Sequence, residues 1–146
     1  MSALNFIFAA HGIILAAIAL QLLFLPAVAN FLFIKPLDLT HLFIARLYGA
    51  ALMSLGIISL LCRDMPNMLP CKRAAAAGFM IFHGIIAVFV FQSREEGIFP
   101  LTTSYGIAAF HGLQAFVLYA WYTATAAQVK AFLKQTKGEE ENKKKK

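Results

Sequence analysis

Long apolar stretches alternate with short polar ones along this chain of 146 residues. The apolar stretches cover about residues 4–24, 42–62, 74–92 and 105–127. A hydrocarbon core of ~30 Å is crossed by about 20 apolar residues in α-helical form, so each stretch has the length of one crossing. The pattern predicts an all-α fold, a bundle of four transmembrane helices that forms one domain over residues 1–134.

Proline and charged residues mark the predicted breaks between these helices. Pro26 bends or ends the first helix, and Asp38 or Thr40 is a candidate N-cap for the second. The remaining breaks fall at about residues 63–73 and 93–104, both of which contain proline. Residues 135–146 are so polar that we expect them to form a disordered, charged cytosolic tail.

The composition agrees with a membrane protein. Hydrophobic residues make up 60% of the chain and charged residues 14%, whereas soluble domains contain about 25% charged residues. The mean hydropathy is +0.72. The net charge of +6 does not indicate nucleic-acid binding, because the basic residues lie beside the apolar stretches and in the tail. We therefore expect membrane lipids and other membrane proteins as partners, and no nucleic acid.

The positions of the basic residues predict the orientation in the membrane. With four spans, the N-terminus, the loop between the second and third helices and the tail share one side. That side holds Arg63, Lys72, Arg73, Lys130, Lys134, Lys137 and Lys143 to Lys146. The opposite loops hold only Lys35 and Arg94, so the positive-inside rule places both termini in the cytosol. Trp121 and its tyrosine neighbours Tyr119 and Tyr122 would then form an interfacial aromatic belt.

The last four residues are all lysine, and Lys143 and Lys144 occupy the fourth and third positions from the end of the sequence. This arrangement resembles the dilysine retrieval signal of endoplasmic-reticulum membrane proteins, which is read in the cytosol. It predicts a multi-pass protein of the endoplasmic-reticulum membrane. The alternative is a basic tail that holds anionic lipid.

Three histidines lie inside the predicted spans, and each is followed by glycine: His11, His83 and His111. At 1.5 Å per residue, His83 lies ~15 Å and His111 ~18 Å from the cytosolic face, nearly level on antiparallel neighbours. His11 lies shallower, at about 10 Å. Ionisable groups at this depth usually face the interior of the bundle and mark a site.

Three interpretations of the histidines stay open. His83 and His111 could be the axial ligands of a haem iron, which helix bundles often hold. They could instead be catalytic, moving protons or binding a polar substrate group, with His11 as a further binding residue. Each could also be neutral and hydrogen-bonded to a neighbouring helix. We predict no cofactor and no other metal site, with haem as the alternative.

Arg46 is a charged residue about six positions into the second predicted helix, where placing its charge in a membrane costs free energy. Glu95 and Glu96 lie at a similar level in the loop before the fourth helix. We expect an ion pair between Arg46 and one of these residues. The alternative is that Arg46 binds an anionic lipid or substrate head group.

Small residues recur at intervals of four, as in Gly12/Ala16 and Ala45/Gly49. In lipid this spacing lets helix backbones approach closely. It predicts a compact bundle and indicates no particular chemistry.

The segment Ala45-Arg46-Leu-Tyr-Gly49-Ala-Ala-Leu ends its helix in Leu61-Cys62-Arg63-Asp64 and precedes a helix with His83. Over about a third of the chain, this arrangement resembles two groups of small four-helix membrane proteins. One is the DoxX-like set, which has a similar Arg-x-x-Gly second helix. The other is the ergosterol-synthesis scaffold family, and that resemblance implies tethering of sterol-synthesis enzymes instead of catalysis.

Two functions follow as hypotheses. The first is a non-catalytic scaffold or accessory subunit of the endoplasmic-reticulum membrane, to which the resemblance adds a role in lipid metabolism. The second is an intramembrane protein or enzyme that binds a lipid-like substrate or haem through His83 and His111. The sequence leaves open whether the protein is an enzyme. Convergence of the two imidazoles on one cavity would favour the second hypothesis.

Overall fold

A computed structural model describes the backbone of residues 3–144 and the side chains of residues 5–138. Its helices are α1 (Ala3–Phe24), the 3-10 helix η1 (Pro26–Leu32), α2 (Leu39–Cys62), α3 (Pro70–Gln92), the 3-10 helix η2 (Ser93–Glu95), α4 (Leu101–Ala124) and α5 (Ala126–Lys144). No described residue is in a β-strand. The predicted all-α class is confirmed.

The helix boundaries follow from local sequence. Asp38 is the N-cap of α2, and its side chain accepts a hydrogen bond from the backbone N–H of His41. Pro70 is the first residue of α3, where a missing N–H costs no hydrogen bond. Gly97 has a φ of +72°, a conformation that favours glycine, in the turn between η2 and α4.

Three of the described helical segments are long and apolar enough to cross a membrane: Asn5–Phe24, Leu39–Cys62 and Pro70–Glu95. The molecule therefore has the character of a membrane protein. The helix α4 is as long as α2 but less apolar, because its first turn includes Thr102, Thr103 and Ser104.

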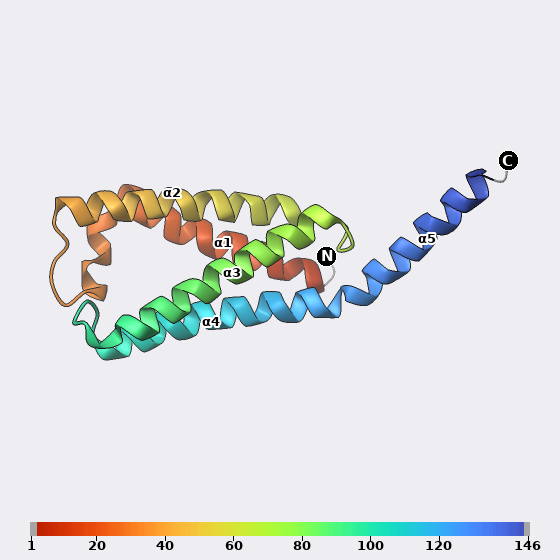
Figure 1. Ribbon diagram of the computed structural model, residues 1–146. Helices are drawn as coiled ribbons and strands as arrows, with labels where there is room; N and C mark the ends of the chain where they lie inside the picture. The colour runs from red at the N-terminus through yellow and green to blue at the C-terminus, as the bar shows by residue number, and fades with distance from the viewer. Residues whose placement is uncertain (1–2, 145–146) are drawn as a thin grey trace.

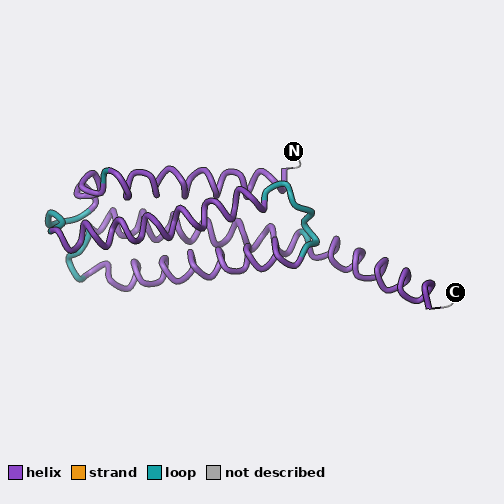
Figure 2. Tube along the Cα trace, turned by 90° about the horizontal axis from the view of Figure 1, so that it is seen from above, coloured by secondary structure: helices purple, strands orange, loops and turns teal. Residues whose placement is uncertain are grey.

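The long helices form two antiparallel pairs, α1 with α2 and α3 with α4 (Figures 1 and 2). Glycines let α1 approach α2 closely. A Cβ atom on Gly12 would lie 2.7 Å from Leu60 Cγ, and one on Gly56 would lie 3.1 Å from the Gly12 carbonyl oxygen. By contrast, a Cβ atom on Gly84 or Gly112 would meet no described atom within 4 Å. The prediction of close contact from small residues is therefore confirmed for the α1–α2 pair.

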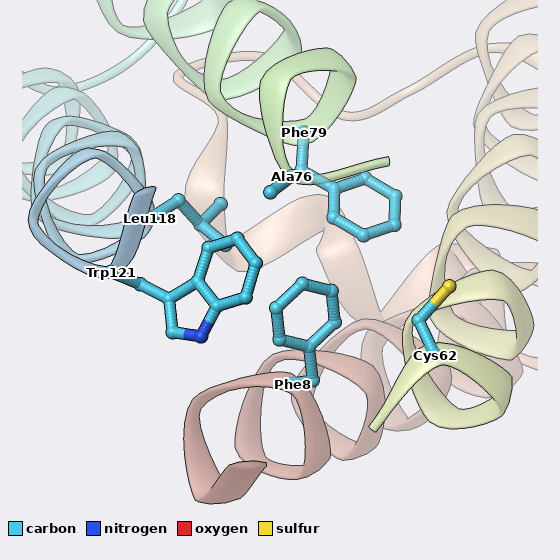
Figure 3. Packing of buried hydrophobic residues seen from close by; sticks show 6 residues of the cluster. All are labelled: Phe8, Cys62, Ala76, Phe79, Leu118 and Trp121. Carbon is cyan, nitrogen blue, oxygen red and sulfur yellow. The ribbon is translucent and has the colours of Figure 1, made fainter. Parts of the chain in front are cut away.

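The two pairs meet at the end of the bundle where α1 begins. The buried residues here come from all four long helices: Phe8, Cys62, Ala76, Phe79, Leu118 and Trp121 (Figure 3). The Phe8 ring contacts Trp121 edge to face, with 4.9 Å between centroids, and also contacts Phe79. Trp121 is only 1% exposed and does not belong to the expected aromatic belt, whereas Tyr119 is 54% exposed. Trp121 points inward because it lies on the same face of α4 as Leu118 and His111.

Two adjacent basic residues of α3 hold the ends of neighbouring helices beside this cluster. The Lys72 ammonium is buried and donates to the backbone carbonyls of Arg63 (3.0 Å) and Met65 (2.8 Å) and to the Asn5 side chain (3.3 Å). Arg73 donates to Thr125 and to the Tyr122 carbonyl at the end of α4. Cations at helix C-termini satisfy free carbonyls and complement the helix dipole.

The chain beyond Thr125 continues as α5, which projects away from the bundle (Figure 1). We expected residues 135–146 to form a disordered tail, but the helix extends to Lys144. Lysine, glutamate and glutamine are good helix formers, and this property outweighs the lack of an apolar face. Residues 145 and 146 lie outside the described part of the structure.

Candidate functional site

Three histidines from three helices form a continuous buried hydrogen-bonded chain. His11 Nδ1 lies 3.0 Å from Ser59 Oγ, and His11 Nε2 lies 2.9 Å from His83 Nε2. His83 Nδ1 lies 2.8 Å from His111 Nδ1. Ser59 Oγ also lies 2.9 Å from the Phe8 carbonyl oxygen. The chain therefore links α1, α2, α3 and α4 through side chains in the middle of the bundle.

The direction of every hydrogen bond in this chain follows from the Phe8 carbonyl. A carbonyl only accepts, so the Ser59 hydroxyl donates to it and must accept from His11 Nδ1–H. A neutral imidazole carries one N–H, and His11 Nε2 is then an acceptor for His83 Nε2–H. By the same step His111 Nδ1–H donates to His83 Nδ1. These tautomers are assigned from the hydrogen-bond network.

One nitrogen at the end of the chain makes no such bond. With its only proton on Nδ1, neutral His111 has a lone pair on Nε2, and no described residue donates to this atom. His111 also lines a large apolar cavity. The buried hydrogen-bonded chain therefore ends at a residue of the cavity wall, and its last acceptor has no donor among the described residues.

The contacts among the three histidines show how they lie relative to one another. His83 and His111 were expected to be nearly level, and they are in direct contact. His11 was expected to be shallower, yet it reaches His83. The reason is that α3 is inclined across the bundle (Figure 1), so residues along α3 gain less depth than in an upright helix.

The cavity lies between the two helix pairs, at the end opposite the Phe8–Trp121 cluster. Its volume is about 680 Å³, and most of its walls are apolar side chains, including Leu15, Leu52, Ile86 and Ile107. The polar residues in its walls are His111, Gln21, His41 and Tyr48. Pockets of this size and character are typical of sites for small apolar molecules.

The connections at this end join the two helix pairs across the cavity. The Ile34 N–H donates to the Ile98 carbonyl at 3.1 Å, and the Phe33 and Phe99 rings lie 4.7 Å apart. Phe33 and Phe99 also line the cavity. The helix pairs are thus joined at both ends and by the histidine chain, and the cavity lies between that chain and the Phe33–Phe99 contact.

The histidines do not fit a haem in this arrangement. Axial ligation would place one imidazole on each side of the macrocycle, yet the His83 and His111 nitrogens are 2.8 Å apart and hydrogen-bonded. Nor do three or more His, Cys, Asp or Glu side chains of the described residues converge as a metal site. The structure favours the interpretation in which the imidazoles hydrogen-bond across helices, and adds a free acceptor to it.

The expected ion pair of Arg46 is absent. Arg46 is exposed and makes no ion pair or hydrogen bond with any described residue, while Glu95 pairs with Arg94 at 3.1 Å and Glu96 pairs with no described cation. At 100° per residue, Arg46 lies about 120° around α2 from buried Leu52. Its side chain therefore leaves the helix toward the outside of the bundle and not toward the α3–α4 connection.

Sequence reasoning missed Ser59 and the role of Lys72. Ser59 is fully buried on the same face of α2 as Gly49, Leu52 and Gly56. A lone hydroxyl in register with two glycines is the signal that could have identified it. Lys72 was used only as one of the basic residues that predict the orientation in the membrane. In the structure it is buried and caps the C-terminus of α2. The proposed retrieval residues Lys143 and Lys144 end α5, and their side chains lie outside the described part.

Comparisons with known proteins do not place the chain in a family. No family matches it, and neither does any curated protein or solved structure. The resemblance of the second and third predicted helices to DoxX-like and ergosterol-synthesis scaffold proteins stays a prediction.

Proposed function

We propose that this protein spans a membrane with α1 to α4 and binds a lipid-like small molecule in the cavity between its two helix pairs. The observation that carries this proposal is the apolar cavity of about 680 Å³ whose wall includes His111, a residue with one ring nitrogen that makes no hydrogen bond to any described residue. An apolar wall with a few placed polar groups is how binding sites combine affinity with orientation.

A cavity-filling variant tests the proposal. Ala45 lines the cavity, whereas Ala50, on the same helix, is exposed and does not. The wild-type protein, purified in mild detergent, is expected to retain an apolar small molecule that mass spectrometry detects after solvent extraction. Ala45→Phe should lose this molecule and Ala50→Phe should retain it. Equal retention by the two variants, or none by the wild type, would contradict the proposal.

The four-span arrangement, with both termini in the cytosol, is part of the proposal. It is supported by the pairing of α4 with α3 along the bundle and by the basic residues near the α2–α3 loop. Cys71 is a natural reporter because it is exposed at that end, while Cys62 is buried. A membrane-impermeant maleimide should label Cys71 from the cytosolic side of intact microsomes, and Cys71→Ser should abolish labelling. Labelling only after permeabilisation would reverse the orientation.

The second candidate is a scaffold or accessory subunit, and Arg46 favours it. An exposed guanidinium on an apolar helix, without a partner in the described chain, calls for an anion from another molecule. An acidic residue of a partner protein would serve. Cross-linking in native membranes should capture a partner that Arg46→Gln loses and Lys35→Gln keeps. Identical cross-linking patterns for the two variants would remove this support.

We place the protein in the endoplasmic reticulum, supported by the lysines from Lys143 onward. Replacing Lys143 and Lys144 with serine should move a fluorescent fusion to later compartments. Lys130→Ser with Lys134→Ser is the matched control, because it removes the same charge from the exposed part of α5. Unchanged localisation of the Lys143/Lys144 variant would contradict this assignment.

A further inference from the structure

The hydrogen-bond chain restricts which molecules can occupy the cavity, and this inference rests on the proposed function. We propose that the cavity selects neutral, largely apolar molecules that carry a hydroxyl group, because His111 can only accept a hydrogen bond from them. An alcohol is bound, and the corresponding ether is rejected. The direction of the hydrogen bonds is set by the Phe8 carbonyl, which lies at the opposite end of the hydrogen-bonded chain from His111.

The first step is that the chain has only one favourable direction. If it ran the other way, the Ser59 hydroxyl would donate to His11 Nδ1. The Ser59 oxygen and the Phe8 carbonyl oxygen would then face each other at 2.9 Å with no proton between them. Two oxygen lone pairs at that distance repel. The observed contact therefore holds the proton of Ser59 on the Phe8 side.

The second step carries that direction to the cavity. Each imidazole has two nitrogens, and both nitrogens of His11 and of His83 are used in the chain. A donor on one side of the ring thus requires an acceptor on the other. The direction that is fixed at Ser59 therefore also determines that His111 Nε2 carries no proton. The cavity wall contributes an acceptor there and no proton.

The third step concerns the ligand. A hydroxyl donates its proton to Nε2, which satisfies an acceptor that otherwise lies unpaired in apolar surroundings. An ether or ester oxygen in the same place would put lone pair against lone pair. A carboxylate is likewise an acceptor only and adds the cost of placing a charge among apolar side chains. A position built to accept a hydrogen bond from the ligand disfavours analogues that lack the donor.

A matched pair of competitors tests the selection. The protein is placed in phosphatidylcholine nanodiscs and labelled with a diazirine derivative of 1-hexadecanol, with mass spectrometry used to locate the label on the cavity walls. Unlabelled 1-hexadecanol is expected to compete at least ~10-fold better than its methyl ether, the ratio that corresponds to one hydrogen bond. Hexadecanoate should compete no better than the ether.

The variant Ser59→Ala tests the direction of the hydrogen bonds without changing the shape of the cavity. Ser59 is not part of the cavity wall, so the variant leaves the space for the ligand unchanged. It removes the group that fixes the direction, and the chain can then reverse and offer an Nε2–H from His111. The preference for the alcohol over the ether should fall toward equality. The matched control is Ser54→Ala, which removes an exposed hydroxyl of the same helix and should keep the full preference.

The tautomers give a readout that does not depend on a ligand. Nitrogen-15 NMR of the wild type should show the proton on Nδ1 of His11, Nε2 of His83 and Nδ1 of His111. Reversed tautomers, or equal competition by alcohol and ether in the wild type, would overturn the inference while leaving the cavity as a binding site. Absence of labelling by any probe, with the predicted tautomers present, would instead count against the proposed function.

Discussion

At the end of the bundle that holds Phe8 and Trp121, all four long helices contribute side chains to one buried cluster. At the end that holds Phe33 and Phe99, the same helices enclose a cavity of about 680 Å³. Apolar side chains predominate in the cluster and in the cavity wall alike, so hydrophobicity alone does not explain the difference. In lipid, apolar side chains gain little by leaving the bilayer for each other. Close packing instead follows from shape and from polar groups that need partners.

Polar groups are treated differently at the two ends. The Lys72 ammonium uses all three of its protons on oxygens of the protein, from Arg63, Met65 and Asn5. At the wall of the cavity, His111 Nε2 has no donor among the described residues. The three bonds of Lys72 hold α1, α3 and the end of α2 together at the first end, although the buried Trp121 Nε1–H there has no partner among the described residues. At the second end, the unpaired acceptor belongs to a residue of the cavity wall, where another molecule can bind.

The largest expected effect comes from removing the centre of the packed end. Trp121→Ala deletes a side chain that is 1% exposed and contacts Phe8, and it should cost about 3–5 kcal/mol of unfolding free energy. Phe31→Ala is the control at the cavity end, where the side chain is 71% exposed. Thermal unfolding in detergent compares them. A loss for Phe31→Ala as large as that for Trp121→Ala would show that the two ends are packed equally.

Lys72→Met should have the next largest effect. The variant keeps most of the side-chain volume but leaves the Arg63 and Met65 carbonyls without their donor, a loss of about 2–4 kcal/mol. Lys134→Met changes an exposed lysine of α5 and should leave the melting temperature unchanged. If Lys72→Met were as stable as the wild type, the capping of α2 by Lys72 would be unimportant.

Gly12→Ala should have a moderate effect on the α1–α2 pair. Its Cβ atom would meet Leu60 Cγ at 2.7 Å and the Gly56 carbonyl oxygen at 2.9 Å, and forcing this contact should cost about 1–3 kcal/mol. Gly84→Ala is the control in α3, where no described atom lies within 4 Å. It should be neutral or stabilising by up to about 1 kcal/mol from helix propensity. The same loss at both positions would refute the difference between the two helix pairs.

The smallest effect is a pH dependence at the cavity end. The His41 backbone N–H, with the His41 side chain, donates to Asp38 and lowers the pKa of that carboxyl below its usual range. The stabilisation is therefore full above the unfolded pKa of about 4 and is lost as the pH falls through the folded value. The melting temperature of the wild type should fall slightly more than that of Asp38→Asn between about pH 5 and pH 3. Parallel curves would show that this cap does not titrate with unfolding.

Much of the fold could be predicted from residue order. The four apolar stretches, the N-cap Asp38 and the level of His83 with His111 all follow from spacing along one helix at a time. Arg46 was predicted less well, because the spacing of Glu95 and Glu96 specified depth but not the direction around α2. The helical form of residues 135–144 was missed because the prediction used only the polar composition of this segment. Composition indicates that the segment is solvated, but it does not specify the local backbone conformation.

The candidate site could be predicted only in part, for the same reason. His11, His83 and His111 stand out in the sequence as ionisable residues within apolar stretches. Their connection through Ser59 to the Phe8 carbonyl cannot be recognised in the sequence. Ser59 is 48 positions from His11 and 51 positions from Phe8. Nothing in the local sequence of Ser59 specifies which helix it faces.

The sequence by itself determined that this protein is helical, that it has apolar segments of membrane-spanning length, and that three imidazoles lie within those segments. These properties depend on neighbours along the chain, where the helix repeat fixes distance. Only the tertiary structure decided that the imidazoles share protons in one direction, that Lys72 is buried, and that the helix pairs separate around a cavity. Those properties depend on the inclination and rotation of one helix against another, which side chains from all four helices set together.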